Sequence, residues 1–124
     1  MDIEDRKRIV EEIVRLSDGI LSCSEGRNYY SLKVGDGPKS LAATVHKDSD
    51  RISFFIPSSD LLGQLRAMEF KFAEATRGRP RSRDWYRSSG LTLSKICENE
   101  DLFKQVVHES VNEVKSRQAK RKIH

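Results

Sequence analysis

Apolar residues along the chain fall into short periodic groups, and each group predicts one element of secondary structure. In the first group they recur every three or four positions between charged residues, which is the period of an amphipathic helix. The members of this group are Ile9, Val10, Ile13, Val14 and Leu16. Asp2 is placed to cap the helix and Gly19 to end it.

Three strand-like runs follow the first helix. Residues 29–34 alternate apolar and polar side chains, which is the period of a strand with one buried face. Residues 41–47 and 51–57 are separated by Asp48-Ser49-Asp50, and this spacing predicts a hairpin. Pro57 ends the third strand because proline has no N–H to donate to a ladder.

Residues 58–75 fit two interpretations. A serine at position 58 or 59 can cap a helix, and the apolar stripe of that helix continues through Met68 to Phe72. The alternation within residues 69–72 instead fits a short strand that follows a shorter helix. Because the helical stripe runs on, we favour one helix over the whole segment.

The last third of the chain predicts a loop, a strand and a helix. Residues 77–90 show no apolar periodicity and indicate a long basic loop. Leu91, Leu93 and Ile96 suit a final short strand, and Asn99 is placed to cap a last helix. Its apolar face comprises Leu102, Phe103, Val106, Val107, Val111 and Val114.

The expected order of elements is α-β-β-β-α-β-α, which places the chain in the α+β class. We expect an antiparallel sheet of three to four strands packed against two to three helices. Residues 1–114 would form a single domain with the basic loop at 77–90, and residues 115–124 a basic C-terminal tail that frays. The layout from the Tyr29 strand to the final helix resembles a small uncharacterised bacterial domain often fused to predicted restriction-type nucleases. That resemblance implies the fold and no activity.

Composition limits the classes of binding partner and the cellular compartment that we expect. The 124 residues carry a formal net charge of +4 with a pI near 9.2, which favours nucleic acid, an anionic membrane or an acidic protein as a partner. Cys23 and Cys97 match neither a CxxC nor a Cys/His ligand spacing, so we expect reduced thiols in the cytoplasm. No apolar run approaches the length of a membrane span, and residues 1–7 are charged where a signal peptide would be apolar. We therefore expect no membrane partner.

The most distinctive motif is Arg77-Gly78-Arg79-Pro80, followed by Arg81. These residues resemble the core of an AT-hook, the short element that lies in the minor groove of A·T-rich DNA. A narrow A·T minor groove concentrates negative potential, and arginines beside a glycine can enter it. The chain departs from the usual pattern because it lacks a proline before the core and has one copy of it. The resemblance implies DNA in preference to RNA.

The residues after this motif suggest a second mode of binding. Trp85 and Tyr86 could stack on unpaired bases, although Trp85 also suits a residue that anchors the loop in the core. Lys120, Arg121 and Lys122 would add attraction that does not depend on sequence. The expected nucleic-acid-binding residues are Arg77, Gly78, Arg79, Pro80, Arg81, Arg83, Trp85, Tyr86 and Arg87.

Two alternatives to nucleic-acid binding stay open. In the first, a protein-interaction domain engages an acidic partner through the basic loop. In the second, Asp60, Glu69 and Lys71 form the site of a Mg²⁺-dependent nuclease, which requires Glu69 and Lys71 to project together from a strand. His46 and His108 have no neighbours at the spacing of a triad or a ligand set. We therefore expect no resident metal, no cofactor and no catalytic residue.

Overall fold

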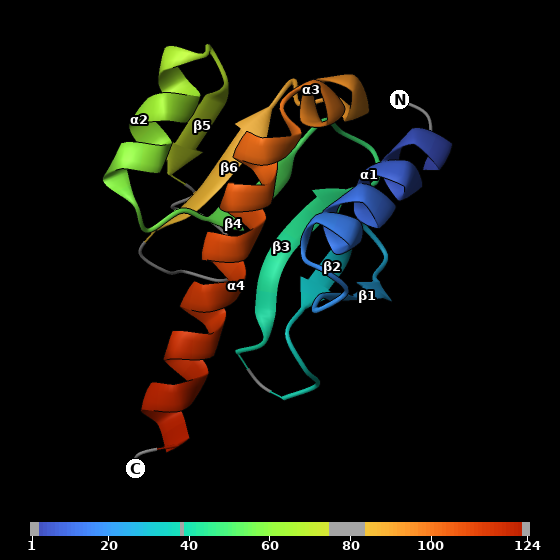
Figure 1. Ribbon diagram of the computed structural model, residues 1–124. Helices are drawn as coiled ribbons and strands as arrows, with labels where there is room; N and C mark the ends of the chain where they lie inside the picture. Colours follow the sequence, from blue (N-terminus) through green and yellow to red (C-terminus); the bar gives the residue numbers. More distant parts are fainter. Residues whose placement is uncertain (1–2, 38, 75–83, 123–124) are drawn as a thin grey trace.

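The computed structural model describes residues 3–37, 39–74 and 84–122 (Figure 1). Their helices are α1 (Ile3–Leu16), α2 (Ser59–Ala67), α3 (Leu93–Glu98) and α4 (Glu100–Lys122). Their strands are β1 (Ser22–Glu25), β2 (Tyr29–Lys33), β3 (Leu41–His46), β4 (Ile52–Phe55), β5 (Lys71–Glu74) and β6 (Trp85–Ser89). None of the described helices is long and apolar enough to cross a membrane.

The strands form one antiparallel sheet in the order β1-β2-β3-β4-β6-β5. The predicted class, α+β with an antiparallel sheet, is confirmed. With six strands and four helices among the described residues, the structure exceeds the expected counts. The predicted hairpin over 41–57 is β3 and β4. Strand β1, which carries the exposed free thiol of Cys23, was not predicted because its four residues are all exposed and have no apolar alternation.

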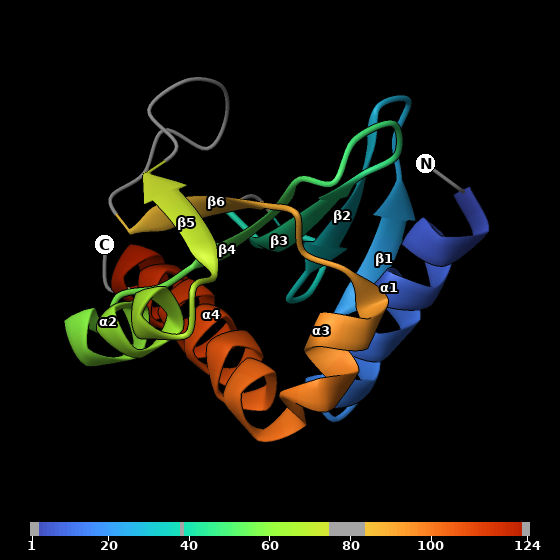
Figure 2. The same ribbon diagram turned by 90° about the horizontal axis from the view of Figure 1, so that it is seen from above.

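All four described helices lie on one side of the sheet, as Figure 2 shows. On that side the strand register aligns one row of residues across five strands: Tyr30, Val45, Ile52, Ser88 and Phe72. Each is at most 5% exposed, and the buried faces of α1 and α4 complete the core with residues such as Ile13 and Phe103. Because side chains alternate along a strand, the intervening residues project from the opposite face, which carries no described helix.

Helix α4 is joined to the sheet at a gap in its ladder. A register shift between Leu32 and Lys33 marks a bulge beside β3, and the β3–β4 pairs end at Ala43 and Phe54. The buried Ser110 hydroxyl fills the next position: it accepts from the Phe55 N–H at 3.0 Å and donates to the Ala42 carbonyl at 2.5 Å. One side chain of α4 thus satisfies a donor and an acceptor that the two strands leave unpaired.

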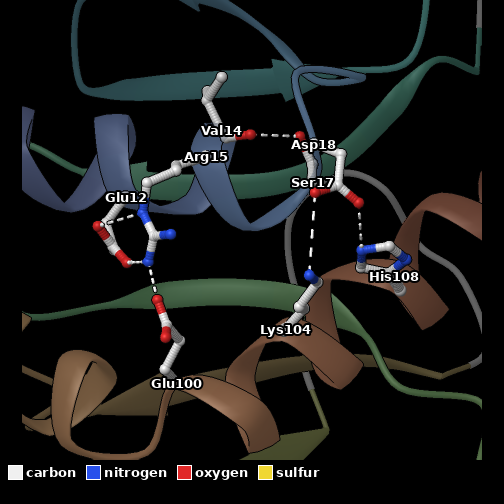
Figure 3. A network of polar contacts seen from close by, with 8 residues as sticks. All are labelled: Glu12, Val14, Arg15, Ser17, Asp18, Glu100, Lys104 and His108. Atoms are coloured by element: carbon white, nitrogen blue, oxygen red, sulfur yellow. Dashed lines mark hydrogen bonds and ion pairs between the residues drawn. The ribbon is translucent and has the colours of Figure 1, made fainter.

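Ion pairs join the outer surfaces of α1 and α4 (Figure 3). Arg15 contacts both Glu12 of its own helix and Glu100 at the start of α4. Asp18, just after α1, lies 3.9 Å from Lys104 and 3.3 Å from His108. Apart from Glu12 these groups are substantially solvent-exposed, so the pairs contribute little to the stability of the fold.

The segment 58–75 is not one helix, and that prediction was wrong. Helix α2 ends at Ala67, and Glu69 adopts a left-handed conformation with φ of 67°. The chain then enters β5, where Phe72 pairs with Ser88 of β6. The apolar stripe continued past the end of the helix because Phe70 and Phe72 contribute to the core from a turn and a strand instead.

Three further predictions in the last third are corrected. Leu93 and Ile96 belong to helix α3, which Thr92 caps through its hydroxyl, so no strand forms there. The last strand is β6, whose residues 85–89 fall inside the predicted basic loop. The residues from 115 to Lys122 continue α4 rather than fraying as a tail. The end of α4 and strand β6 were missed because both are rich in polar residues. These residues lie on the exposed side of the helix and on the sheet face without helices, so they give no apolar period.

Replacing Ser110 with alanine should lower the free energy of unfolding by about 2 kcal/mol, because it leaves the Phe55 N–H and the Ala42 carbonyl buried without partners. Ser116→Ala is the matched control, since Ser116 is exposed on the same helix. Urea denaturation followed by circular dichroism measures both. Equal midpoints for the two variants would contradict the proposed role of the Ser110 bridge.

Candidate nucleic-acid interface

The sheet face opposite the helices carries a row of polar side chains that crosses the strands. Tyr29 pairs with His46, and the His46 N–H donates to the Arg51 carbonyl at 3.0 Å. Arg51 and Ser89 flank the Ile52–Ser88 pair, and Ser89 pairs with Lys71. Strand alternation therefore brings an aromatic ring, an imidazole, a guanidinium, a hydroxyl and an ammonium into one line. At about 4.8 Å between strands, the line is about 19 Å long.

A second row lies beside the first on the same face. It consists of Ser31, Thr44, Ser53, Arg87 and Ala73. Apart from the arginine these side chains are small, and none is acidic. Thr44 and Ser53 are buried, Ser31 and Arg87 are half-buried, and Ala73 is exposed. The Arg87 guanidinium is therefore the main charge of this row.

Charge is divided unequally between the two faces of the sheet. The face without helices carries four cations at strand or strand-adjacent positions: Lys33, Arg51, Lys71 and Arg87. The two acidic residues of the strands, Glu25 and Glu74, pair with Tyr30 and Tyr86 and so belong to the other face. Among the described residues no carboxylate forms an ion pair with any of the four cations. The four cations are thus not neutralised by direct ion pairs, although Asp50 and Glu69 line a pocket together with Lys71.

The electrostatics of His46 report on these cations. Partial burial lowers the pKa of His46 below its ordinary value, and Arg87 and Arg51 lower this pKa further, while Asp48 opposes them. Its ring centroid lies 5.6 Å from that of Tyr29, with 39° between the planes. The His46 imidazole therefore lies beside the Tyr29 ring and is influenced by three guanidinium groups, those of Arg87, Arg51 and Arg6.

Two buried polar atoms on this face have no hydrogen-bond partner among the described residues. They are Nε of Arg87 and Oγ of Ser53, which belong to directly paired positions on β6 and β4. Buried polar atoms are usually satisfied, but His108 and Glu109 on α4 have such atoms too, so the property does not by itself mark a site. Here it shows that the domain's own described acceptors do not occupy the Arg87 Nε–H.

Arg6 of α1 fixes the backbone at the end of the first row. Its guanidinium, 2% exposed, donates to the carbonyls of His46 at 2.9 Å and Arg51 at 3.3 Å. Burial lowers the pKa of Arg6, and the nearby Asp50 partly compensates. A buried charge from the helical layer thus holds the β3–β4 hairpin in place, while the same two residues present their side chains on the opposite face.

The expected aromatic platform is not available in the folded chain. Trp85 is 2% exposed, and its ring centroid lies 4.8 Å from that of Phe55. The guanidinium of Arg117 lies over Phe55 at 4.5 Å. Tyr86 projects from the helical side, where Arg66 lies 5.9 Å from its ring centroid. The loop-anchoring interpretation of Trp85 therefore fits the structure: the Trp85–Phe55 pair follows Arg87–Ser53 in the register of the same face, but both rings are buried.

Of the predicted site residues, Arg87 lies on the face without helices. The predicted Arg77, Gly78, Arg79, Pro80, Arg81 and Arg83 lie outside the described residues, in the segment between β5 and β6. The side chains of Lys120, Arg121 and Lys122 lie outside them as well. Tyr29, His46 and Arg51 were not predicted as site residues, because only the pairing of distant strands brings them into one row.

The residues of the nuclease hypothesis do not converge. Glu69 lies in a turn before β5, not on the strand as that hypothesis requires. Glu69 and Lys71 line a pocket of about 200 Å³ with Asp50, whereas Asp60 lies in the first turn of α2 and does not line it. No group of three histidine, cysteine or acidic residues suited to a metal ion occurs within the described ranges.

Comparisons with known proteins add no relationship to this geometry. No protein-family model, curated protein or solved structure matches the chain. The two resemblances drawn from the sequence, to an AT-hook and to a small bacterial domain, therefore stay predictions. The candidate site is therefore defined by the charged side chains of the sheet face and by the register of the strands that carry them.

The pKa of His46, followed by NMR titration of its ring protons, should lie below 6.5 and rise when Arg87 is replaced by glutamine. Arg8→Gln on α1 should leave it unchanged, since Arg8 is exposed on a helix. A folded state that favours neutral His46 keeps this contribution to stability above pH about 6.5 and loses it as the pH falls toward the lowered pKa. An unchanged His46 pKa in the Arg87→Gln variant would show that Arg87 does not act on His46.

Proposed function

We propose that the protein is a non-enzymatic nucleic-acid-binding domain. The binding surface comprises the sheet face without helices and the arginine-rich segment 77–83 between β5 and β6. One observation carries the proposal: four cations gather on one face of the sheet, while the acidic strand residues project from the other face. A helix-free face with this charge is complementary to a polyanion.

The cations suit contacts to phosphates more than readout of bases. Lysine and arginine side chains that meet phosphate release condensed counterions, and the resulting affinity depends on salt but little on sequence. Arg51 and Lys71 lie two strands apart in the first row, or about 10 Å. Arg87 in the second row offers a third point of contact. A nucleic-acid backbone that crosses the strands would therefore meet cations along its path.

Sequence preference, in this proposal, comes from the arginine-rich segment. The run from Arg77 to Pro80 would enter the minor groove of A·T-rich DNA, as its likeness to an AT-hook implies. Its neighbours Glu74 and Trp85 belong to β5 and β6, the two strands that carry Lys71 and Arg87.

Removing two cations from the face should weaken binding and flatten its salt dependence. We expect Arg51→Gln/Arg87→Gln to reduce the slope of log affinity against log salt by roughly 1.4 to 1.8, the effect of two lost phosphate contacts. Arg8→Gln/Lys115→Gln, which removes the same charge from exposed helix positions, should reduce it much less. Fluorescence anisotropy with A·T duplex, G·C duplex and single-stranded DNA at several salt concentrations gives the slopes.

Two outcomes would count against the proposal. Negligible binding of all three nucleic acids would remove it, and binding of an acidic peptide alone would favour the protein-interaction alternative. The separate variant Arg77→Ala/Arg79→Ala tests the segment between β5 and β6. Its expected effect is the loss of preference for A·T duplex, with the salt slope set by the sheet face largely retained.

A further inference from the structure

We infer that the sheet face takes single-stranded nucleic acid, with an unpaired base stacked on Tyr29 and the adjoining phosphates on the cations of the first row. The inference rests on the proposed function and names its ligand. It assigns base stacking to Tyr29. The arginine-rich segment has no aromatic residue for this role, and Trp85 is buried.

Tyr29 is unusual in its exposure. Its side chain is 37% exposed, and the other large hydrophobic residues exposed within the described ranges, Ile20 and Met68, are aliphatic. The remaining tyrosines, Tyr30 and Tyr86, belong to the helical side of the sheet. Tyr29 is therefore the described aromatic ring that a ligand can reach on the face without helices.

The surroundings of Tyr29 keep its ring accessible. The next residue along β2 on the same face is Ser31, which pairs with Ser24 on one side and Thr44 on the other. These short side chains leave the ring standing above its neighbours, with the His46 ring beside it at 5.6 Å. A base has room to lie against such a ring, and small hydroxyl groups nearby can bond to its edges.

An exposed ring next to unpaired cations distinguishes a single strand from a duplex. In a duplex both faces of each base are covered by stacking, so an aromatic side chain on a flat sheet gains nothing from it. A single strand offers its base faces, and stacking on aromatic residues adds to the phosphate contacts without selecting a sequence. The order Tyr29, His46, Arg51 across the strands supplies one site for a base, a neutral imidazole beside it and a cationic site at Arg51.

The test compares a single-stranded dodecamer, as RNA and as DNA, with a duplex of the same length, using fluorescence anisotropy at low salt. We expect tighter binding of the single strand by the natural chain. Tyr29→Ala should weaken single-strand binding roughly 5- to 150-fold, the contribution of one stacked base, and leave duplex binding unchanged. Tyr29→Phe keeps the ring and should keep the affinity.

Met68→Ala is the matched control, because it removes an exposed apolar side chain from the helical side of the molecule. Circular dichroism verifies the fold, and Tyr29→Leu replaces Tyr29→Ala if the alanine variant unfolds. Equal binding of duplex and single strand, with no effect of Tyr29→Ala, overturns this inference but leaves the proposed function intact. Failure of the natural chain to bind any nucleic acid removes both.

Discussion

Burial of one face of the sheet beneath the helices is the constraint on which the remaining structure depends. Ile13 of α1 and Phe103 of α4 need apolar partners, and the strands supply them from alternate positions such as Val45 and Ile52. Since a strand has two sides, each residue given to the core places its neighbour on the opposite face. Opposite the helices the side chains share a common register and are mostly polar, and the buried Phe55–Trp85 pair lies at the end of the same face.

Two polar groups from the helical layer keep this arrangement in place. Ser110 bridges β3 and β4 where their ladder ends, and Arg6 binds the carbonyls at the turn of the same hairpin. Both are buried. Ser110 satisfies a backbone donor and acceptor that the ladder leaves unpaired, and Arg6 bonds the His46 carbonyl and adds a second bond to the Arg51 carbonyl, which also accepts from the His46 N–H. The helical layer thus fixes the β3–β4 hairpin at both ends. On the face without helices, His46 is therefore held in a defined position beside Tyr29.

The sequence predicted the parts of the fold whose apolar residues repeat regularly. The first helix, the β3–β4 hairpin and the apolar face of the last helix were identified because burial on one side imposes a period. Strands β1 and β6 were missed, since one is exposed throughout and the other carries Arg87 and two serines. Of the candidate site, Arg87 could be proposed from its basic neighbours. His46 and Arg51 belong to the predicted hairpin, but Tyr29 joins them only through the pairing of β2 with β3, so the row of three could not be foreseen.

The position of Lys71 on an edge strand has a consequence for how a ligand is held. Strand β5 has a hydrogen-bonded neighbour on one side, β6, and consists of four residues. Edge strands of this length open more readily than the centre of a sheet. In the proposed function, a polyanion that reaches Lys71 would also hold β5 against β6, and part of its binding energy would go into ordering this edge of the sheet. In this proposal, ligand binding and the ordering of β5 would therefore be thermodynamically linked, so that each favours the other.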